Sequence, residues 1–214
     1  MTSLRSNLRQ TVYDVLLDTY KSNSSVRSSK RTDRLHKGFA EFLSSFLSME
    51  EFEQIFEQKA PSAADNFKID LLCSKKEEEL FFLLKQIGSS YNKNRKNYAN
   101  TTMGEVFRAL SGFPNRRAIH VNFVPEYAPC FSSDGDIKKV EKTNHQDLSY
   151  FYEQYEKLNP GCAKECVLNF RIDEGLLLLK TRKELYDGLV HRGPHSVQLL
   201  NYDEFKSSLE DFLG

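Results

Sequence analysis

The sequence predicts one domain of mixed α/β (α+β) class, in which helices flank a central mixed sheet. Segments with helical periodicity come first, a group of strand-like segments follows, and helical and strand-like segments alternate toward the C-terminus. The chain has 214 residues, which suits a single domain, and its 16 Phe and 10 Tyr supply large side chains for one hydrophobic core.

Apolar side chains recur at helical spacing over residues 4–20 and again over residues 35–58. We expect one helix in the first range. The second range should hold two helices that are broken near Ser48, where Glu51 completes the pattern of a capping box. Polar loops are predicted between and after these helices, at residues 21–32 and 59–66.

Residues 67–73 and 79–85 have the composition of strands and are separated by a polar turn. The second segment is apolar on both faces, which is typical of a strand in the middle of a sheet. We then expect an Asn-rich loop at 86–100, a helix at 101–110, a turn at 112–115 and a strand at 118–124. The C-terminal part should contain an irregular segment at 128–146, helices near 146–158 and 172–189, a strand at 197–200 and a helix at 203–212.

The overall composition limits the classes of protein. The 30 basic and 30 acidic residues give a formal net charge of zero, and no apolar run is long enough to span a membrane. The N-terminus lacks the apolar block of a signal peptide, and four Cys are too few for a disulfide framework. We therefore expect a cytoplasmic protein without a membrane partner.

The zero net charge conceals a strongly basic stretch. Residues 85–117 hold seven basic residues and one acidic residue, Glu105, which is a local charge of +6. The stretch is also rich in Asn, Ser and Thr, which together with Lys and Arg contact phosphates and base edges. A nucleic-acid partner is one interpretation, and a solvated polar loop is the other. A second basic stretch at 22–37 either binds the DNA backbone or is an ordinary loop.

Asp70 and Lys85 lie on the two neighbouring strands, on either side of the turn near Lys76. At about 3.3 Å per residue, they can meet near one end of the hairpin. A carboxylate and an ammonium among apolar neighbours are costly to bury unless they are paired or bind a ligand. A carboxylate at a strand end suits Mg²⁺, and a nearby Lys suits metal-assisted phosphodiester hydrolysis. The alternative is a structural salt bridge.

These residues, together with the basic stretch, resemble the core of a known nuclease family. The layout comprises Asp70, the run Phe82-Leu83-Leu84-Lys85, the segment Ser89-Ser90-Tyr91-Asn92-Lys93-Asn94 and the pattern Gly104-Glu105-x-x-Arg108. It resembles type II restriction endonucleases of the PD-(D/E)xK nuclease superfamily, mainly over residues 36–124. In that family a helix precedes a twisted sheet, the first acid lies on one core strand, and an acid-x-Lys signature lies on the next.

The resemblance implies a Mg²⁺-dependent, site-specific endonuclease that cuts double-stranded DNA in a bacterial or archaeal cell. It also implies a restriction-endonuclease-like central mixed sheet flanked by helices, with Asp70 as the main Mg²⁺ ligand and Lys85 as the catalytic lysine. The chain would then comprise N-terminal helices at 1–60, a catalytic core at 67–124, and a C-terminal helical part with the last strand at 125–214.

The sequence departs from the family pattern at one position. The acid expected two residues before the lysine falls on Leu83, which cannot bind a metal. Some members of the family carry this acid on a neighbouring helix, and Glu105 is then the candidate for a catalytic acid and second metal ligand. Glu41 on the N-terminal helix is a further catalytic candidate, unless it is an ordinary exposed acid. If neither reaches Asp70, the chain binds DNA without cutting it.

Polar and basic side chains of the central stretch are candidates for DNA contact, and we predict the set Ser89, Ser90, Asn92, Lys93, Asn94, Arg95, Lys96 and Arg116. Since type II sites are often palindromic, we also expect a homodimer. The alternative functions are a non-catalytic nucleic-acid-binding protein on the same fold and a structural or interaction protein.

Two further pairs have the spacing of zinc ligands. Cys162 and Cys166, with His191 and His195, make a C-x₃-C…H-x₃-H set. Either they hold a structural zinc, or the Cys pack as small apolar residues and the His lie on the surface.

Overall fold

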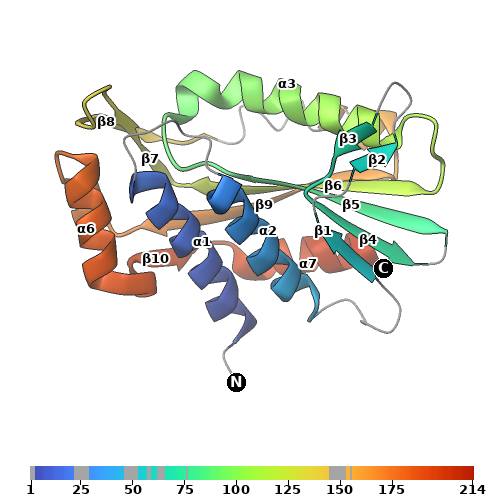
Figure 1. Ribbon diagram of the computed structural model, residues 1–214, viewed down its shortest axis with the longest axis horizontal. Helices are drawn as coiled ribbons and strands as arrows, with labels where there is room; N and C mark the ends of the chain where they lie inside the picture. The colour runs from blue at the N-terminus through green and yellow to red at the C-terminus, as the bar shows by residue number, and fades with distance from the viewer. Residues whose placement is uncertain are drawn as a thin grey trace.

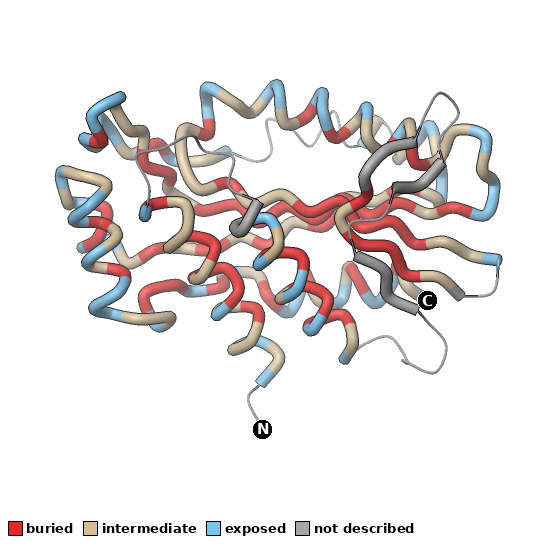
Figure 2. Tube along the Cα trace, viewed as in Figure 1, coloured by how far each residue is buried: buried red, intermediate tan, exposed pale blue. Residues whose placement is uncertain are grey.

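The computed structural model describes residues 3–21, 29–45, 53–56, 59–61, 66–75, 77–144, 153–154 and 156–214. It confirms the mixed α/β class. A central sheet lies between two layers of helices, with α3 on one face and α1, α2 and α7 on the other (Figure 1). The strands in the middle of the sheet form the most buried part of the molecule, while one side of each covering helix is exposed (Figure 2).

The central sheet has the strand order β1-β4-β5-β6-β9-β10. These strands span Glu53–Phe56, Leu71–Lys75, Glu78–Gln86, Arg116–Pro125, Ala163–Ile172 and Val197–Leu199. The pairs β1–β4, β4–β5 and β9–β10 are antiparallel, whereas β5–β6 and β6–β9 are parallel. The helix α3 (Tyr91–Leu110) provides the crossover between the parallel strands β5 and β6.

Strand β5 contributes to the hydrophobic core on both of its faces, as the sequence predicts. Phe82 and Leu84 pack on the side of α1 and α2, and Phe81 and Leu83 pack on the side of α3. Alternation of this kind is the period-two pattern of a strand buried between two layers. It fixes which side chains of β5 face each helix layer.

The helices α1 (Leu4–Lys21) and α2 (Ser29–Leu43) cover one face of the sheet. Leu8, Val12, Val15 and Leu16 form the buried stripe of α1, and Arg34 of α2 pairs with Asp18 of α1 at 2.9 Å. The helix predicted at 4–20 is therefore confirmed. The loop predicted at 21–32 is wrong for residues 29–32, which already belong to α2, and residues 22–28 lie outside the described residues.

Two differences from prediction concern the first strands. Glu53–Phe56 forms β1 and not part of a second helix, because the segment pairs with β4. The proposed break at Ser48 and its cap lie outside the described residues. The strand predicted at 67–73 is interrupted at Ile69 and Asp70, since Asn66–Lys68 (β3) pairs with Lys59–Pro61 (β2) in a separate small sheet.

The loop predicted at 86–100 is wrong over most of its length, since α3 begins at Tyr91. Asn has a low helix propensity, so the Asn-rich composition favours a loop on local grounds. However, Tyr91, Ala99, Thr102 and Val106 are buried on one stripe of the helix. Burial of that stripe against the sheet outweighs the local preference, as is usual for helices in proteins.

The C-terminal part contains more strand than the sequence predicts. The irregular segment predicted at 128–146 includes a hairpin of β7 (Tyr127–Phe131) and β8 (Ile137–Lys142). The strand β9 begins at Ala163 with alternating burial and lies beside β6. The predicted division is therefore wrong in calling 125–214 mainly helical, because that part completes the sheet.

The remaining elements close the fold. In place of one helix at 172–189, the structure has α5 (Glu174–Leu177) and α6 (Arg182–Arg192), followed by the 3₁₀ helix η1 (Gly193–Ser196). Thr181 and Glu184 form a capping box that starts α6. The last predicted strand and helix are confirmed as β10 and α7 (Tyr202–Leu213). Within the described residues, no helix is long and apolar enough to cross a membrane.

Candidate active site

Asp70 lies directly before β4, at the end of the β4–β5 hairpin that is farthest from the turn. The register pairs Leu71 with Phe82, which brings Asp70 level with Leu83. The Oδ2 atom of Asp70 accepts a hydrogen bond from the backbone N–H of Leu84 at 2.7 Å. The break between β3 and β4 thus places a carboxylate one residue from Lys85, and the expected meeting of Asp70 and Lys85 at one end of the hairpin is confirmed.

Lys85 and Glu105 form an ion pair that links β5 to α3. The Nζ atom of Lys85 lies 3.2 Å from Oε1 of Glu105, and about a quarter of each side chain is exposed (28% and 27%). Lys85 follows Leu83 on the α3-facing side of β5, because alternate residues of a strand share a face. Glu105 therefore reaches the side of the sheet that Leu83 faces.

The carboxyl group of Glu105 is in an environment that disfavours its charged form. Burial raises the pKa of Glu105, the negative charge of Asp70 raises it further, and Lys85 and Arg108 oppose the rise without cancelling it. The Oε2 atom of Glu105 is buried and has no hydrogen-bond partner in the described part of the chain. A buried carboxylate oxygen of this kind is costly unless it binds a cation or a proton.

His36 on α2 completes the surroundings of Asp70 and is a residue that sequence reasoning missed. Its Nε2 atom lies 3.4 Å from Oδ1 of Asp70, and the imidazole is almost fully buried. The available signal was a polar side chain on the helical stripe of Phe39, Ala40 and Leu43, which faces the core. The imidazole and the N–H of Leu84 thus approach different oxygens of the carboxylate.

Glu41 does not join this group, so its assignment as a catalytic residue is wrong. It is exposed, and on an α-helix it is rotated by about 140° from His36, five residues earlier. His36 occupies the site-facing position of α2 instead. Of the two acids considered as replacements for the one missing at Leu83, only Glu105 lies against the Asp70–Lys85 pair.

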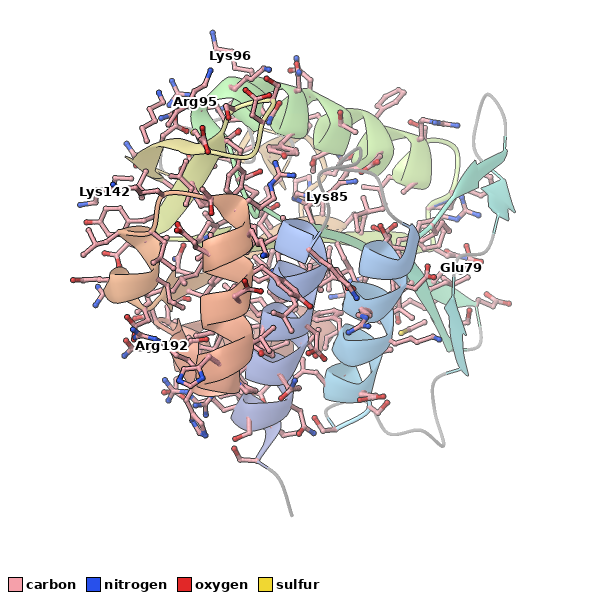
Figure 3. The ribbon with its side chains drawn as sticks, turned by 60° about the vertical axis from the view of Figure 1, so that its left-hand side comes forward. Glu79, Lys85, Arg95, Lys96, Lys142 and Arg192 are labelled. Carbon is pink, nitrogen blue, oxygen red and sulfur yellow. The ribbon has the colours of Figure 1, made fainter. Side chains whose placement is uncertain are left out.

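A cleft of ≈ 680 Å³ opens where Asp70 and Lys85 meet. Figure 3 shows Lys85 between α3 and the upper ends of α1 and α2. One wall comes from the first two helices, and the other comes from α3 and the segment that leads into it. The lining residues are Val15, Thr19, Thr32, Leu35, Asp70, Leu84, Lys85, Gln86, Gly88, Ser89, Ser90, Lys93, Asn94, Asn97, Tyr98 and Thr101.

Seven of the eight predicted DNA-contacting residues separate into two groups. Ser89, Ser90, Lys93 and Asn94 line the cleft. Asn92, Arg95 and Lys96 do not line it, and Figure 3 shows Arg95 and Lys96 on the outer side of α3. Sequence reasoning did not single out Gln86 or Asn97 as site residues, although both belong to the same polar stretch.

Arg116 is buried and occupies a structural position, so its assignment to DNA contact is wrong. Its side chain is 4% exposed, its Nε donates to Glu79 at 2.6 Å, and its guanidinium lies 3.5 Å from the ring centroid of Phe113. It stands at the opposite end of β6 from Asn122, the residue paired with Lys85. An arginine held by an acid and two aromatic rings, Phe113 and Phe81, is not available to a phosphate.

The start of α3 departs from ordinary helix-capping rules. Ser90, the residue before the helix, has a φ of 51° and makes no side-chain capping bond; it is the only non-glycine with positive φ in the described ranges. The first turn contains no acidic residue, although a negative charge there would interact favourably with the helix dipole. Instead, the backbone N–H of Asn92 donates to Oε2 of Glu141, a buried residue of β8, at 3.1 Å.

A buried polar network lies behind the ion pair, between α3 and the sheet. Thr102 Oγ1 lies 3.0 Å from Nε2 of His120, and Asn122 Nδ2 lies 3.0 Å from Nδ1 of the same ring. Asn122 also donates to Glu165 of β9. These contacts tie α3 to β6 and β9 and so fix the helix that carries Glu105.

The donor set fits Mg²⁺ better than zinc. Mg²⁺ is commonly bound by one or two carboxylates together with waters and substrate oxygens, and Asp70 and Glu105 match that requirement. In the described ranges, no group of three or more His, Cys, Asp or Glu is gathered as a metal centre. The zinc alternative for Cys162, Cys166, His191 and His195 is not supported, because Cys166 is buried on β9 whereas both His are exposed on α6 and η1.

Comparison with known proteins gives little further guidance. No family model matches the chain, and no curated protein matches it. Among solved structures, one similar chain is described as the crystal structure of a protein of unknown function, AF1548. The two chains are 11% identical, and the match covers 64% of this chain and 57% of the other at a TM-score of 0.31.

Proposed function

We propose that this chain is a Mg²⁺-dependent endonuclease of restriction type, which hydrolyses phosphodiester bonds at specific sites in double-stranded DNA. One observation carries the proposal. Asp70 and Lys85 lie at the same end of one hairpin and line one cleft, and Glu105 lies against Lys85. The family resemblance implies this combination of an acid, a lysine and a second acid. Here the second acid comes from α3, because the strand position that carries it in the family is Leu83.

Asp70 and Glu105 are the residues that would hold the metal. When bound, Mg²⁺ would stabilise charge on the phosphate and lower the pKa of a bound water. Lys85 would place a positive charge beside the scissile phosphate, and its contact with Glu105 holds the ammonium at the end of the cleft. The N–H of Leu84 donates to the carboxylate of Asp70 and so helps to hold its orientation, and the imidazole of His36 lies 3.4 Å from the other carboxylate oxygen.

The test is cleavage of plasmid and linear DNA of varied sequence, in Mg²⁺ and in EDTA. We expect discrete products with Mg²⁺ only, and loss of cleavage in Asp70→Asn and Lys85→Ala. Absence of cleavage by the wild type, or variants that cut as well as the wild type, would overturn the proposal. Since a two-fold DNA site matches a two-fold protein, we also propose a homodimer, which sedimentation analysis with and without DNA tests directly.

The second candidate is a nucleic-acid-binding protein without catalysis. Leu83 favours it, because this side chain is buried in the apolar cluster under α3 where the family carries an acid. Salt-dependent DNA binding without cleavage at any Mg²⁺ concentration would support this candidate. Absence of both binding and cleavage would favour a structural or interaction protein.

A further inference from the structure

The two ends of the cleft differ in the residues that line them, which gives the cleft a direction. The charged lining residues are Asp70, Lys85 and Lys93. Asp70 and Lys85 mark one end of the cleft. Lys93 lies in the first turn of α3, whereas Glu105, which contacts Lys85, lies well beyond the middle of that helix. The cleft therefore runs along α3, from the Asp70–Lys85 end toward the start of the helix.

The wall formed by α3 carries a regular stripe of hydrogen-bonding groups. Asn94, Asn97 and Thr101 follow one another at intervals of three and four residues, so they share one side of the helix. Tyr98 lies on the same side and presents an aromatic ring. Between Lys93 and Thr101 the stripe is about 12 Å long at 1.5 Å per residue.

The opposite wall has a different chemistry. Val15 and Thr19 of α1 and Leu35 of α2 supply apolar and hydroxyl groups, and the described lining residues of these two helices include no charged side chain. A chain with phosphates on one side and less polar groups on the other fits between these walls. The volume of ≈ 680 Å³ lies in the range of sites for small ligands, so the cleft itself takes a short segment of one strand of a duplex while the other strand stays outside it.

The charge distribution on α3 supports an anionic occupant. Lys93, the basic residue of α3 that lines the cleft, stands in the first turn of the helix, where the helix dipole is already positive, and that turn contains no acid. This arrangement is unfavourable for an isolated helix, and sites that break local rules are often functional. A polyanionic strand along this half of α3 would offset the unfavourable charge.

We propose that the cleft binds one DNA strand along α3, with the scissile phosphate at the Asp70–Lys85 end and the adjoining nucleotides against Asn97, Asn94 and Lys93. This inference rests on the proposed endonuclease function and defines the substrate that the site needs. At about 3.4 Å per base step, the 12 Å stripe spans three to four nucleotides. The enzyme thus needs that many nucleotides on one side of the cleaved bond.

The experiment starts from a cut site mapped in the plasmid assay. Synthetic duplexes carry this site, and the cleaved strand is shortened stepwise on the 5′ side or on the 3′ side. We expect kcat/KM to fall steeply when one of the two flanks becomes shorter than about three nucleotides, and to change little when the other flank is shortened. Equal sensitivity on both sides would overturn the strand path, while cleavage itself would leave the endonuclease function intact.

Two variants of the same type on the same helix locate the path. Asn97→Ala removes an amide that lines the cleft, and Asn100→Ala removes an equally exposed amide that does not line it. We expect Asn97→Ala to lower kcat/KM about tenfold on the long substrate, and Asn100→Ala to have no effect. The effect of Asn97→Ala should disappear on the substrate that lacks the sensitive flank. A purely structural defect would lower kcat/KM on both substrates.

A salt titration gives an independent readout. In Lys93→Ala, the slope of log binding constant against log salt should decrease by about 0.7–0.9, as for the loss of one phosphate contact. An unchanged slope, or an Asn97→Ala loss that persists on the shortened substrate, would overturn the proposal. A wild type that cuts no DNA would instead overturn the endonuclease function on which it rests.

Discussion

The Nζ atom of Lys85 lies 3.2 Å from Oε1 of Glu105, so the end of strand β5 meets helix α3 at an ion pair beside the cleft. Glu105 is the acid of a stretch with a local charge of +6. The pair places a second carboxylate near Asp70, although the strand position that carries it in the resembling nucleases is Leu83.

Mg²⁺ should stabilise the folded chain through Asp70 and Glu105. A ligand that binds only the folded state at 100 times its Kd contributes about 2.7 kcal/mol, which corresponds to roughly 5–10 °C in Tm for a chain of this size. We expect Asp70→Asn and Glu105→Gln to abolish this rise, and Glu41→Gln to keep it. Calorimetric melting with and without Mg²⁺ checks the prediction, and an equal rise in all four proteins would contradict it.

His36 should act on the metal through its contact with Asp70. Loss of a group that orients a metal ligand lowers metal affinity about 10–100-fold. We expect this loss in His36→Leu, and a partial recovery in His36→Gln, which keeps a polar group beside Asp70. The Mg²⁺ concentration at half-maximal Tm rise measures the effect. Identical midpoints for both variants and the wild type would show that the contact has no role.

Arg116 should matter for stability and not for DNA. Arg116 is buried but its partner Glu79 is 36% exposed, so removing the arginine costs roughly 1.5–3 kcal/mol, as for the loss of hydrogen bonds to a charged group. Arg116→Ala should lose about that amount, and Arg116→Lys should recover little, because an ammonium cannot reproduce the planar stacking on Phe113. Urea unfolding measures the loss. The DNA affinity of the folded variant should equal that of the wild type. A weaker affinity would show that Arg116 contacts DNA after all.

The sequence predicts those parts of the site that depend on residues close together in the chain, and not those that depend on the packing of distant segments. The Asp70–Lys85 meeting follows from a short hairpin, so it is predictable from spacing. The helix at Tyr91–Leu110 is not, because its Asn-rich composition favours a loop and only burial against the sheet reverses that preference. Arg116 appears as one more basic residue until the fold brings Glu79 and Phe113 to it.

Other parts of the fold depend on contacts between distant residues. The strand β9 lies beside β6 in the middle of the sheet, a pairing that no local pattern indicates. His36 is recognisable in sequence as a polar residue on an apolar stripe, but such a histidine is more often an ordinary core residue. The contact with Asp70, far along the chain, distinguishes it.

The carboxylate of Glu141, which accepts a hydrogen bond from the start of α3, should make the stability of the fold decrease at acidic pH. Its burial alone would raise the pKa, but hydrogen bonds from Lys139 and from the backbone of Asn92 lower the pKa of Glu141 to about 2. A carboxyl group with a lowered pKa stabilises the fold above its unfolded pKa, and this contribution disappears as the pH falls toward the folded value.

At neutral pH, Glu141→Gln should therefore lower the free energy of unfolding by about 2–3 kcal/mol. The difference between the two proteins should shrink from pH 5 downward and vanish near pH 2 (about the folded pKa). Urea unfolding across this pH range measures it, with Asp134→Asn, an exposed acid of the same hairpin, as the control. A difference that does not change with pH would refute the assigned role of the carboxylate.

We propose Glu105 as the second acid of a Mg²⁺-dependent site. The most direct test of this proposal is the single-turnover rate of DNA cleavage as a function of Mg²⁺ concentration for the wild type, Glu105→Gln and Glu41→Gln. We expect Glu105→Gln to need at least about tenfold more Mg²⁺ or to lose cleavage altogether, and the curve of Glu41→Gln to superimpose on that of the wild type. A Glu105→Gln curve that superimposes on the wild type would contradict the proposal.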